Sequence, residues 1–409
     1  MVTTMASTTT QSNSDDAVRL SRRVAISRLL AAAGAGALAT RLAWSQGVGQ
    51  LFGEATQLTD LGMDLSEPQR AAGTAFVQRH ATVDVHCHPG RFFLSHLAYE
   101  TPTTRALGEP FEEQVLADLG AGRVSAALFA GVSDMRLLEL SAERGIRAIR
   151  GFEPGEAYSD YRRQVAELRR LVEHHQVARG LNPRDVLAAR RNHQTAAIFS
   201  VEGGDFIEDR LDRVHEAFRD GVRAITVVHY HINQIGDIQT EVPVHNGLTP
   251  LGKSIIREMN AAGVVVDLAH ATFAVTKDAV EVSTKPVMIS HSNLTTAALN
   301  HPRLISPEHA RLVASAGGII GSVPSGIGQN TFADFIDSIL RLVDAVGIDH
   351  VAIGTDMDAN YRPVLRNYRD WGLIPAALLA RGLDEAAVAK VMGENFLRIF
   401  QATLSGKAR

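Results

Sequence analysis

The sequence contains almost no cysteine and very little lysine. Cys87 is the only cysteine in 409 residues, which excludes an intrachain disulfide. There are five lysines, the first at Lys253, and the formal net charge is -4 without a long basic block, so nucleic-acid binding is not expected. With 45% hydrophobic and 21% charged residues, the composition is that of a folded globular protein rather than a disordered chain.

The amino-terminal part lacks a hydrophobic run long enough for a mature transmembrane helix. The apolar run from Leu29 to about Ala39 is too short to span a bilayer. It follows Ser21-Arg22-Arg23, which resembles a twin-arginine export signal, and residues 1–18 are polar and predicted to be disordered. These features favour a signal peptide, with an amphipathic amino-terminal helix as the alternative.

Small residues at Ala43-Trp44-Ser45 offer a cleavage site before Gln46. We therefore expect residues 1–46 to be a disordered start and signal peptide, and residues 47–409 to form one domain. The expected location is the periplasm or outside the cell, reached by the twin-arginine route. That route carries folded proteins across the bacterial inner membrane, and no stable membrane span is expected after cleavage.

From residue 81 onward, short β-rich runs alternate with helical stretches. The predicted strands are mostly apolar and cover 81–87, 124–131, 196–202, 222–229, 264–269, 286–291, 317–323 and 350–356. Predicted helices between them include 162–177, 250–262, 307–315 and 333–346. Eight strands alternating with helices predict an α/β fold, the (β/α)8 TIM-type barrel. Residues 133–195, predicted to be helical, and 359–383 are expected to be insertions that cover the active site.

The first predicted strand ends in two histidines. His86 and His88 are two residues apart, so they lie on one face of an extended chain, and Cys87 faces the other way. Two imidazoles on one face can chelate one divalent metal ion. Taken alone, the pattern is also typical of a strand end with two exposed histidines.

Further potential ligands occur where later strands end. In a (β/α)8 barrel the chemistry takes place at the carboxyl ends of the strands. This sequence places Glu202, His229, His270, His291 and Asp356 there. Each has an ordinary explanation alone, as a loop residue or a cap. Together with His86 and His88 they favour two zinc-class ions with nitrogen and oxygen ligands, sharing a glutamate and activating one water. The histidines expected to be surface or loop residues are His231, His245 and His301.

Several stretches of this sequence resemble a known family. They are Ser200-Val201-Glu202-Gly203-Gly204, Leu248-Thr249-Pro250-Leu251-Gly252, Val266-Asp267-Leu268-Ala269-His270, Ser290-His291-Ser292 and Gly393-Glu394-Asn395-Phe396-Leu397-Arg398. Through their joint occurrence, residues 80–404 resemble the membrane dipeptidase (renal dipeptidase) family, zinc metallopeptidases with an amidohydrolase-like barrel. The resemblance implies two Zn²⁺ ions and hydrolysis of dipeptides that have a free carboxylate, with a D-residue tolerated at the carboxyl side.

The resemblance also implies roles for single residues. The implied metal ligands are His86, His88, Glu202 as the bridge, His270, His291 and Asp356. His88 stands where many members have Asp, so this site has one negative charge fewer. Asp356 would also handle the proton, His229 would face the substrate carbonyl, and Arg303 would hold the substrate carboxylate. The expected partner is a small dipeptide, and a homodimer is a candidate assembly.

Two other classes of function compete with this interpretation. One is another dinuclear hydrolase, acting on a lactone, an amide or a phosphoester. Many such barrels bridge their metals with a carbamylated lysine at a strand end, but no lysine precedes Lys253 here. The other is a binding protein or inactive barrel, for which loss of a ligand would be expected. Every ligand position carries a competent side chain.

Overall fold

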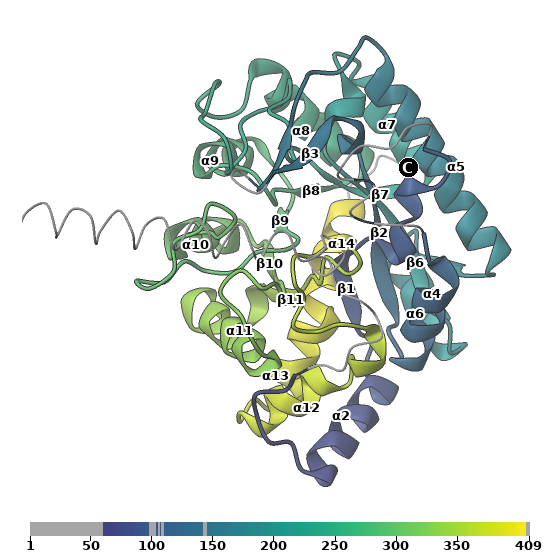
Figure 1. Cartoon of the computed structure of the whole chain (residues 1–409), viewed down its shortest axis with the longest axis vertical. Helices are drawn as coiled ribbons and strands as arrows, with labels where there is room; N and C mark the ends of the chain where they lie inside the picture. The colour runs from purple at the N-terminus through teal and green to yellow at the C-terminus, as the bar shows by residue number, and fades with distance from the viewer. Residues whose placement is uncertain (1–59, 98–103, 105–106, 108–109, 142–144, 406–409) are drawn as a thin grey trace, which may run out of the picture. The chain divides into compact units, whose positions relative to one another are not determined.

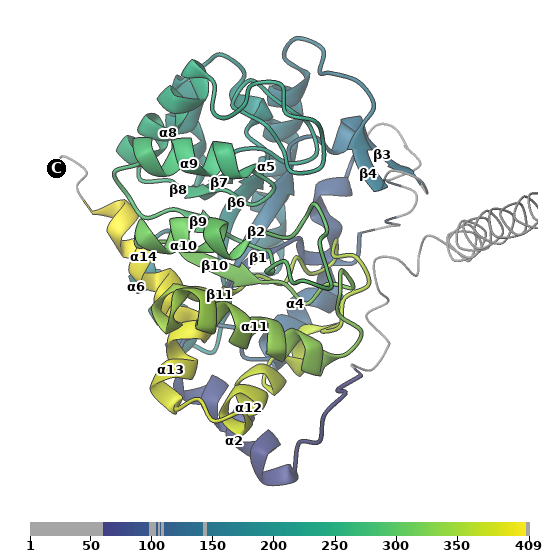
Figure 2. The ribbon, with the colours of Figure 1, turned by 90° about the vertical axis from the view of Figure 1, so that its left-hand side faces the viewer.

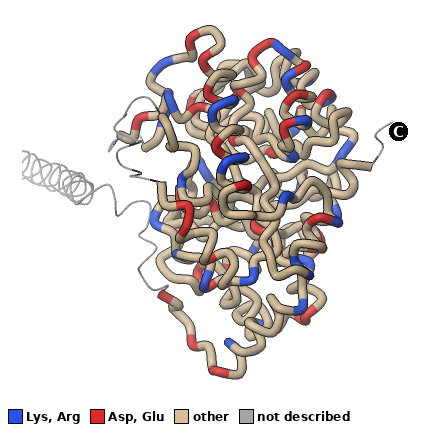
Figure 3. The backbone as a smooth tube through the Cα atoms, turned by 90° about the vertical axis from the view of Figure 1, so that its right-hand side faces the viewer, with Lys and Arg blue, Asp and Glu red and all other residues tan. Residues whose placement is uncertain are grey.

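The computed structural model describes residues 60–97, 104, 107, 110–141 and 145–405 (Figure 1). The predicted signal peptide, residues 1–46, lies outside the described residues. The described residues all belong to one compact unit, Gly49–Arg409. None of the helices in the described ranges is long and apolar enough to cross a membrane. Basic and acidic residues are interspersed along the described chain rather than gathered by sign (Figure 3).

Eight strands of the described chain form a closed parallel barrel (Figures 1 and 2). In chain order the barrel strands are β1 (Val83–Cys87), β2 (Ala126–Val132), β6 (Ala196–Glu202), β7 (Val222–Thr226), β8 (Val265–Asp267), β9 (Met288–Ile289), β10 (Ile319–Ser322) and β11 (Val351–Ile353). Each pairs with the next in this order, and β11 pairs with β1 to close the ring. A short extra strand, β5 (Ala178–Arg179), pairs with the start of β6. The predicted (β/α)8 fold is confirmed.

Helices surround this barrel (Figure 1). The longer ones are α2 (Glu67–Arg79), α4 (Glu112–Ala121), α5 (Glu156–His174), α6 (Pro183–Arg191), α7 (Asp212–Asp220), α8 (Pro250–Ala262), α9 (Phe273–Val282), α10 (Pro307–Ser315), α11 (Phe332–Val346), α12 (Leu373–Ala380) and α14 (Asn395–Leu404). The helices α8 and α10 have their predicted bounds, because the Thr249 and Ser306 side chains accept backbone N–H bonds and a proline follows each cap.

The insertion after β2 was predicted from the sequence to be helical, but it is not purely helical. Two strands in it, β3 (Leu138–Ser141) and β4 (Gly145–Ala148), form an antiparallel pair before α5 begins. Leu140 lies opposite Ile146, so apolar residues meet across the pair with a period of two, which overrides the weaker helical pattern. The Ala148 N–H donates to the carbonyl oxygen of Tyr230, which ties this hairpin to the loop after β7.

The helix α14 covers the amino-terminal end of the barrel. Phe396, Ile399 and Phe400 are buried in one apolar cluster with residues that begin strands, including Val83 and Ile319. Burial of several large side chains at this end makes it a packed base, since each contributes about 1.5–3 kcal/mol relative to exposure. The opposite, carboxyl-terminal end of the barrel is therefore the end available for chemistry.

Five barrel strands, β7 to β11, stop earlier than the sequence predicts, and two buried aspartates account for the ends of β8, β9 and β11. Asp267 Oδ1 accepts the backbone N–H groups of Ala269 at 3.1 Å and Ser290 at 2.9 Å. Asp84 Oδ1 in the same way accepts the N–H groups of His86 and Thr355. The carboxylate oxygen accepts the N–H groups in place of the carbonyl oxygen of a neighbouring strand. The strand pairing can therefore end while these N–H groups stay hydrogen-bonded.

Candidate metal centre and active site

The strand ends bring together all seven candidate residues that the sequence analysis took from them. Glu202 is the last residue of β6, and His86 lies within β1. The others follow strands directly or within three residues: His88, His229, His270, His291 and Asp356. Six of the seven side chains are nearly inaccessible, and Asp356 is the exception with 21% exposure.

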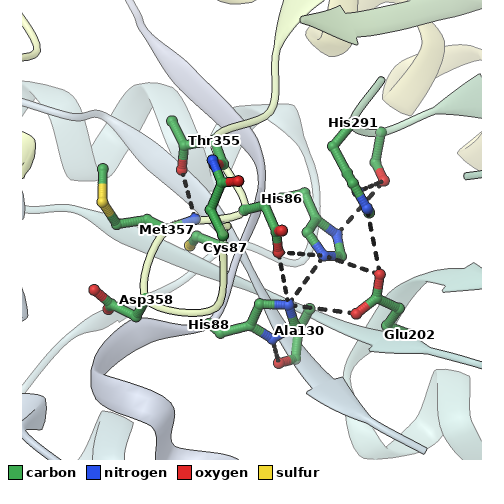
Figure 4. A network of polar contacts seen from close by, with 12 residues as sticks. His86, Cys87, His88, Ala130, Glu202, His291, Thr355, Met357 and Asp358 are labelled. Atoms are coloured by element: carbon green, nitrogen blue, oxygen red, sulfur yellow. Dashed lines mark hydrogen bonds and ion pairs between the residues drawn. The ribbon is translucent and has the colours of Figure 1, made fainter. Parts of the chain in front are cut away.

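The carboxylate of Glu202 lies among five imidazoles, and Figure 4 shows those of His86, His88 and His291. Its Oε1 is 3.0 Å from Nε2 of His270 and 3.5 Å from Nε2 of His86 and of His291. Its Oε2 is 3.4 Å from Nε2 of His88 and of His229. Both oxygens of one buried carboxylate thus face ring nitrogens, which is the arrangement that a bridging ligand requires.

The ligand atoms form three overlapping groups, each within 4.8 Å. Within the described residues these groups are His86 with Glu202 and His291; His86 with His88 and Asp356; and Glu202 with His229 and His270. His86 and Glu202 each belong to two groups, so the groups adjoin one another. All are nitrogen and oxygen donors, whereas Cys87 turns away and its Sγ donates to the carbonyl oxygen of Leu128 at 3.4 Å.

Backbone and hydroxyl groups hold the ligand rings. His88 Nδ1 lies 2.8 Å from the carbonyl oxygen of Ala130, which can only accept, so Nδ1 carries the proton (Figure 4). His291 Nδ1 lies 2.9 Å from Ser290 Oγ. In both rings the Nε2 atom is left to face the centre, the usual arrangement of a metal-binding histidine.

The electrostatics of the cluster favour an ionised carboxylate at Glu202 and neutral imidazoles at His270 and His291. Burial opposes ionisation of Glu202, but the charges of His229 and His86 hold its pKa well below the usual range. Burial lowers the pKa of His270 and His291 well below the usual value, and Arg303 and His86 respectively add to this. Neutral imidazole and ionised carboxylate are the forms that bind metal.

His88 behaves differently from these two histidines. Burial lowers its pKa, but hydrogen bonds to Asp356 and Glu202 outweigh burial and raise the pKa to about 10. Its Nε2 is 3.2 Å from Asp356 Oδ1. A cation, here a proton, is therefore strongly favoured at this position between two carboxylates.

The donor set fits divalent ions. The Nε2 atoms of His86 and His88 are 3.2 Å apart, and those of His270 and His291 are 3.1 Å apart. His270 and His291 are kept neutral by burial, and lone pairs that face each other at such a distance repel unless a cation lies between or beside them. His270 Nδ1 also has no hydrogen-bond partner among the described residues. Imidazole and carboxylate with no thiolate suit a zinc-class ion.

Arg303 reaches the same site from the loop after β9. Its Nη1 donates to Gln239 Oε1 at 2.7 Å, and its Nη2 is 3.0 Å from His270 Nε2. Arg303 was predicted to lie near the substrate, whereas Gln239 was not predicted, because it is a polar loop residue without any pattern around it. Gln239 fixes one edge of the guanidinium and leaves the other directed at the ligand cluster.

Asp134 is the second residue that the sequence analysis missed. It follows β2, is fully buried, and its Oδ1 lies 2.6 Å from Nδ1 of His229. Burial lowers the pKa of His229, but the charges of Asp134 and Glu202 outweigh it and raise that pKa. The available signal was its position three residues after the predicted strand 124–131, but position alone does not indicate a bond to His229.

Unusual backbone conformations occur at the site. His270 and Asp356 have φ angles of 66° and 53°, a region that residues other than glycine rarely adopt. A Cβ at Gly321 would lie 1.8 Å from the carbonyl oxygen of Ser290, and one at Gly354 would lie 1.9 Å from it. The positive φ angles of His270 and Asp356 each imply strain of about 1–3 kcal/mol, which is typical of functional sites held by the surrounding fold.

The remaining loop histidines do not join the cluster. His245 and His301 are exposed, as expected. His231 is half-buried, and its Nδ1 lies 2.7 Å from Asp205 Oδ1. The three metal-ligand groups of the described chain contain none of these histidines.

A sequence model of the membrane dipeptidase family, Peptidase family M19, matches residues 74–408. The chain belongs to the membrane dipeptidase family. A dipeptidase of Claviceps purpurea (strain 20.1), tcpJ, is 32% identical over 227 residues, which are 53% of this chain and 53% of that protein. A dipeptidase of Clonostachys rogersoniana, verJ, is 29% identical over 248 residues, 58% of this chain and 64% of that protein. The chain thus spans about half to two thirds of these curated relatives.

Solved structures agree in fold. The probable dipeptidase PvdM from Pseudomonas aeruginosa is 20% identical with a TM-score of 0.67, and the match covers 82% of this chain and 98% of that one. A metallopeptidase from Rhodobacter sphaeroides, liganded with a phosphinate mimic of the dipeptide L-Ala-D-Ala, is 18% identical with a TM-score of 0.67, over 79% and 99%. The barrel is therefore the fold of the membrane dipeptidase family.

Proposed function

We propose that this member of the family is a dinuclear, zinc-dependent dipeptidase that hydrolyses dipeptides with a free carboxylate and tolerates a D-residue at the carboxyl side. One observation carries the proposal: both oxygens of the buried Glu202 face imidazole Nε2 atoms within 3.5 Å. Family membership and the two fungal relatives named as dipeptidases support the substrate class. The phosphinate mimic of L-Ala-D-Ala in the Rhodobacter structure makes L-Ala-D-Ala a suitable first substrate.

The family resemblance suggests which residues would hold the ions, and the distances between their ligand atoms support this. Glu202 would bridge two ions, with His270 and His291, whose Nε2 atoms are 3.1 Å apart, on one side. On the other side the residues are His86, His88 and Asp356. Bound zinc-class ions supply a Lewis acid for the substrate carbonyl and a water activated at neutral pH. His88 adds a neutral ligand rather than a charged one, so the centre retains more net positive charge than it would with a carboxylate at that position.

Three residues of the chain would act on the substrate itself. Arg303 offers a guanidinium, which can grip a carboxylate with two parallel hydrogen bonds. His229 directs Nε2 toward the centre, where it can hydrogen-bond the oxygen of the scissile carbonyl. Asp356, the most exposed carboxylate of the cluster, would take a proton from water and deliver it to the leaving amine.

A substrate panel tests the function. Wild type and Asp356→Asn are assayed with L-Ala-L-Ala, L-Ala-D-Ala, a lactone and a phosphotriester, with metal content measured in both proteins. We expect the wild type to cleave dipeptides, and the variant to lose at least about 10²-fold in kcat, the usual scale of general acid–base catalysis. A two-metal wild type that cleaves the lactone or phosphotriester but no dipeptide would leave only the broader class of dinuclear hydrolase.

A further inference from the structure

The carboxylate of Asp134 holds two consecutive residues of the loop after β7. Its Oδ1 lies 2.6 Å from Nδ1 of His229, and its Oδ2 accepts the backbone N–H of Tyr230 at 3.0 Å. Asp134 is fully buried, and its own backbone carbonyl accepts the N–H of Leu137. Both carboxylate oxygens are therefore engaged by the segment that carries His229, and water does not compete for them.

This contact determines which nitrogen of His229 faces the centre. A carboxylate only accepts hydrogen bonds, so Nδ1 of His229 must carry a proton. The other ring nitrogen, Nε2, then lies 3.4 Å from Glu202 Oε2, next to the ligand groups. Rotating the ring by half a turn would replace both nitrogens by carbons and would leave the buried carboxylate without one of its partners, which is unfavourable.

We propose that Asp134 is a positioning residue for peptide hydrolysis, acting through His229 by fixing the orientation and the Nδ1 proton of its ring. The proposal rests on the function given above, since His229 is expected to meet the substrate carbonyl. Asp134 itself does not touch the substrate. The alternative is a purely structural carboxylate that stabilises the loop through Tyr230 alone.

The Asp134→Asn variant separates these two roles. The asparagine Oδ1 can still accept the N–H of Tyr230, so the loop contact is kept. The amide Nδ2 then faces His229 and donates to Nδ1, which forces the imidazole proton onto Nε2. In ¹⁵N NMR spectra of zinc-loaded full-length protein, with the His229 signals assigned by a His229→Asn variant, we expect the proton to move from Nδ1 to Nε2. An unchanged Nδ1–H would overturn the proposal, whatever the substrate is.

A double-mutant cycle tests the catalytic consequence. Asp134→Asn alone should lower kcat by about 10- to 100-fold, the usual scale for a residue that orients a functional histidine, with KM and metal content nearly unchanged. In the His229→Asn background the same substitution should have almost no further effect on kcat. Equal losses in both backgrounds would mean that Asp134 acts on the loop and not through His229.

Asp237 provides a matched control. It is also fully buried and holds the same loop, accepting the backbone N–H groups of Val244, His245 and Gly247, but it makes no contact with His229. Any loss of kcat caused by Asp237→Asn should be equal in the two backgrounds. The cycle is run with whichever substrate of the panel is turned over, so that absence of dipeptide cleavage contradicts the proposed function while the NMR result still decides the role of Asp134.

Discussion

The backbone N–H of Asp356 donates to the carbonyl oxygen of His86 across 2.9 Å, joining the last site residue in the sequence to the first. The bond continues the pairing of β11 with β1 that closes the barrel. Residues 270 positions apart therefore approach each other only in the closed ring. The ligand cluster depends on closure of the fold, and opening of β1 from β11 would separate two ligands at once.

Glu202→Gln tests the bridging carboxylate. The amide keeps the size of the side chain but removes the negative charge that faces five imidazoles. We expect zinc binding after dialysis to fall from two ions to one or none, with loss of activity. Glu208→Gln is a control on the following loop, where the carboxylate contacts Arg213 and the Gly155 N–H instead. Retention of two tightly bound ions by Glu202→Gln would contradict the bridge.

Substitutions of Arg303 should affect dipeptides with a free carboxylate more than carboxyl-amidated dipeptides. Its guanidinium is oriented by Gln239, so Arg303→Lys loses the paired geometry and Arg303→Ala loses the charge. We expect both variants to raise KM for free dipeptides by about 10-fold or more, since hydrogen bonds to charged groups contribute about 1.5–3 kcal/mol. Carboxyl-amidated dipeptides serve as the control, with little change expected. If KM rose equally for both substrates, the carboxylate would be held elsewhere.

We predict that His309, which lies outside the metal-ligand groups, makes the protein less stable at acid pH. It is buried, its Nε2 lies 2.7 Å from Thr276 Oγ1, and burial lowers its pKa to about 4 from 6.5. Between these two pH values His309 is protonated in the unfolded chain but neutral in the folded chain. The free energy of unfolding therefore decreases as pH falls from about 6.5 to 4, by about 3 kcal/mol at most. Urea unfolding from pH 7 to 4 measures this.

His309→Gln should make the stability of the protein less dependent on pH over that range, because glutamine can bond Thr276 and does not titrate. His174→Gln, on an exposed position of α5, is the control and should follow the wild type. Parallel curves for His309→Gln and wild type would show that His309 does not contribute.

Export is a separate proposal, motivated by Ser21-Arg22-Arg23 before the apolar run. We propose that residues 1–46 direct the protein through the twin-arginine route. A reporter fused to residues 1–50 should reach the periplasm, and replacing Arg22 and Arg23 by Lys should block this, whereas Arg28→Lys should not. Fractionation of cells that express each fusion measures the result, and undiminished export of the double variant would exclude the route.

The barrel could be predicted from the sequence because strands are identified by local patterns of apolar residues. Apolar runs such as Ile198 to Val201 identify strands, and the rule that chemistry takes place at their carboxyl ends then identifies residues such as Glu202. Asp134 and Gln239 could not be assigned in this way. Their roles depend on partners 95 and 64 positions away, which only the folded chain brings within hydrogen-bond distance. The early ends of β8, β9 and β11 likewise depend on distant side chains, because backbone N–H groups there donate to Asp84 and Asp267.

The central claim is that two ions sharing Glu202 are needed for peptide hydrolysis. The most direct measurement is to remove metal from the full chain with a chelator, add Zn²⁺ stepwise, and follow bound zinc together with L-Ala-D-Ala cleavage. The account predicts that activity increases until two equivalents are bound per chain and then stays constant. Full activity with one bound equivalent, or no cleavage with two, would contradict it.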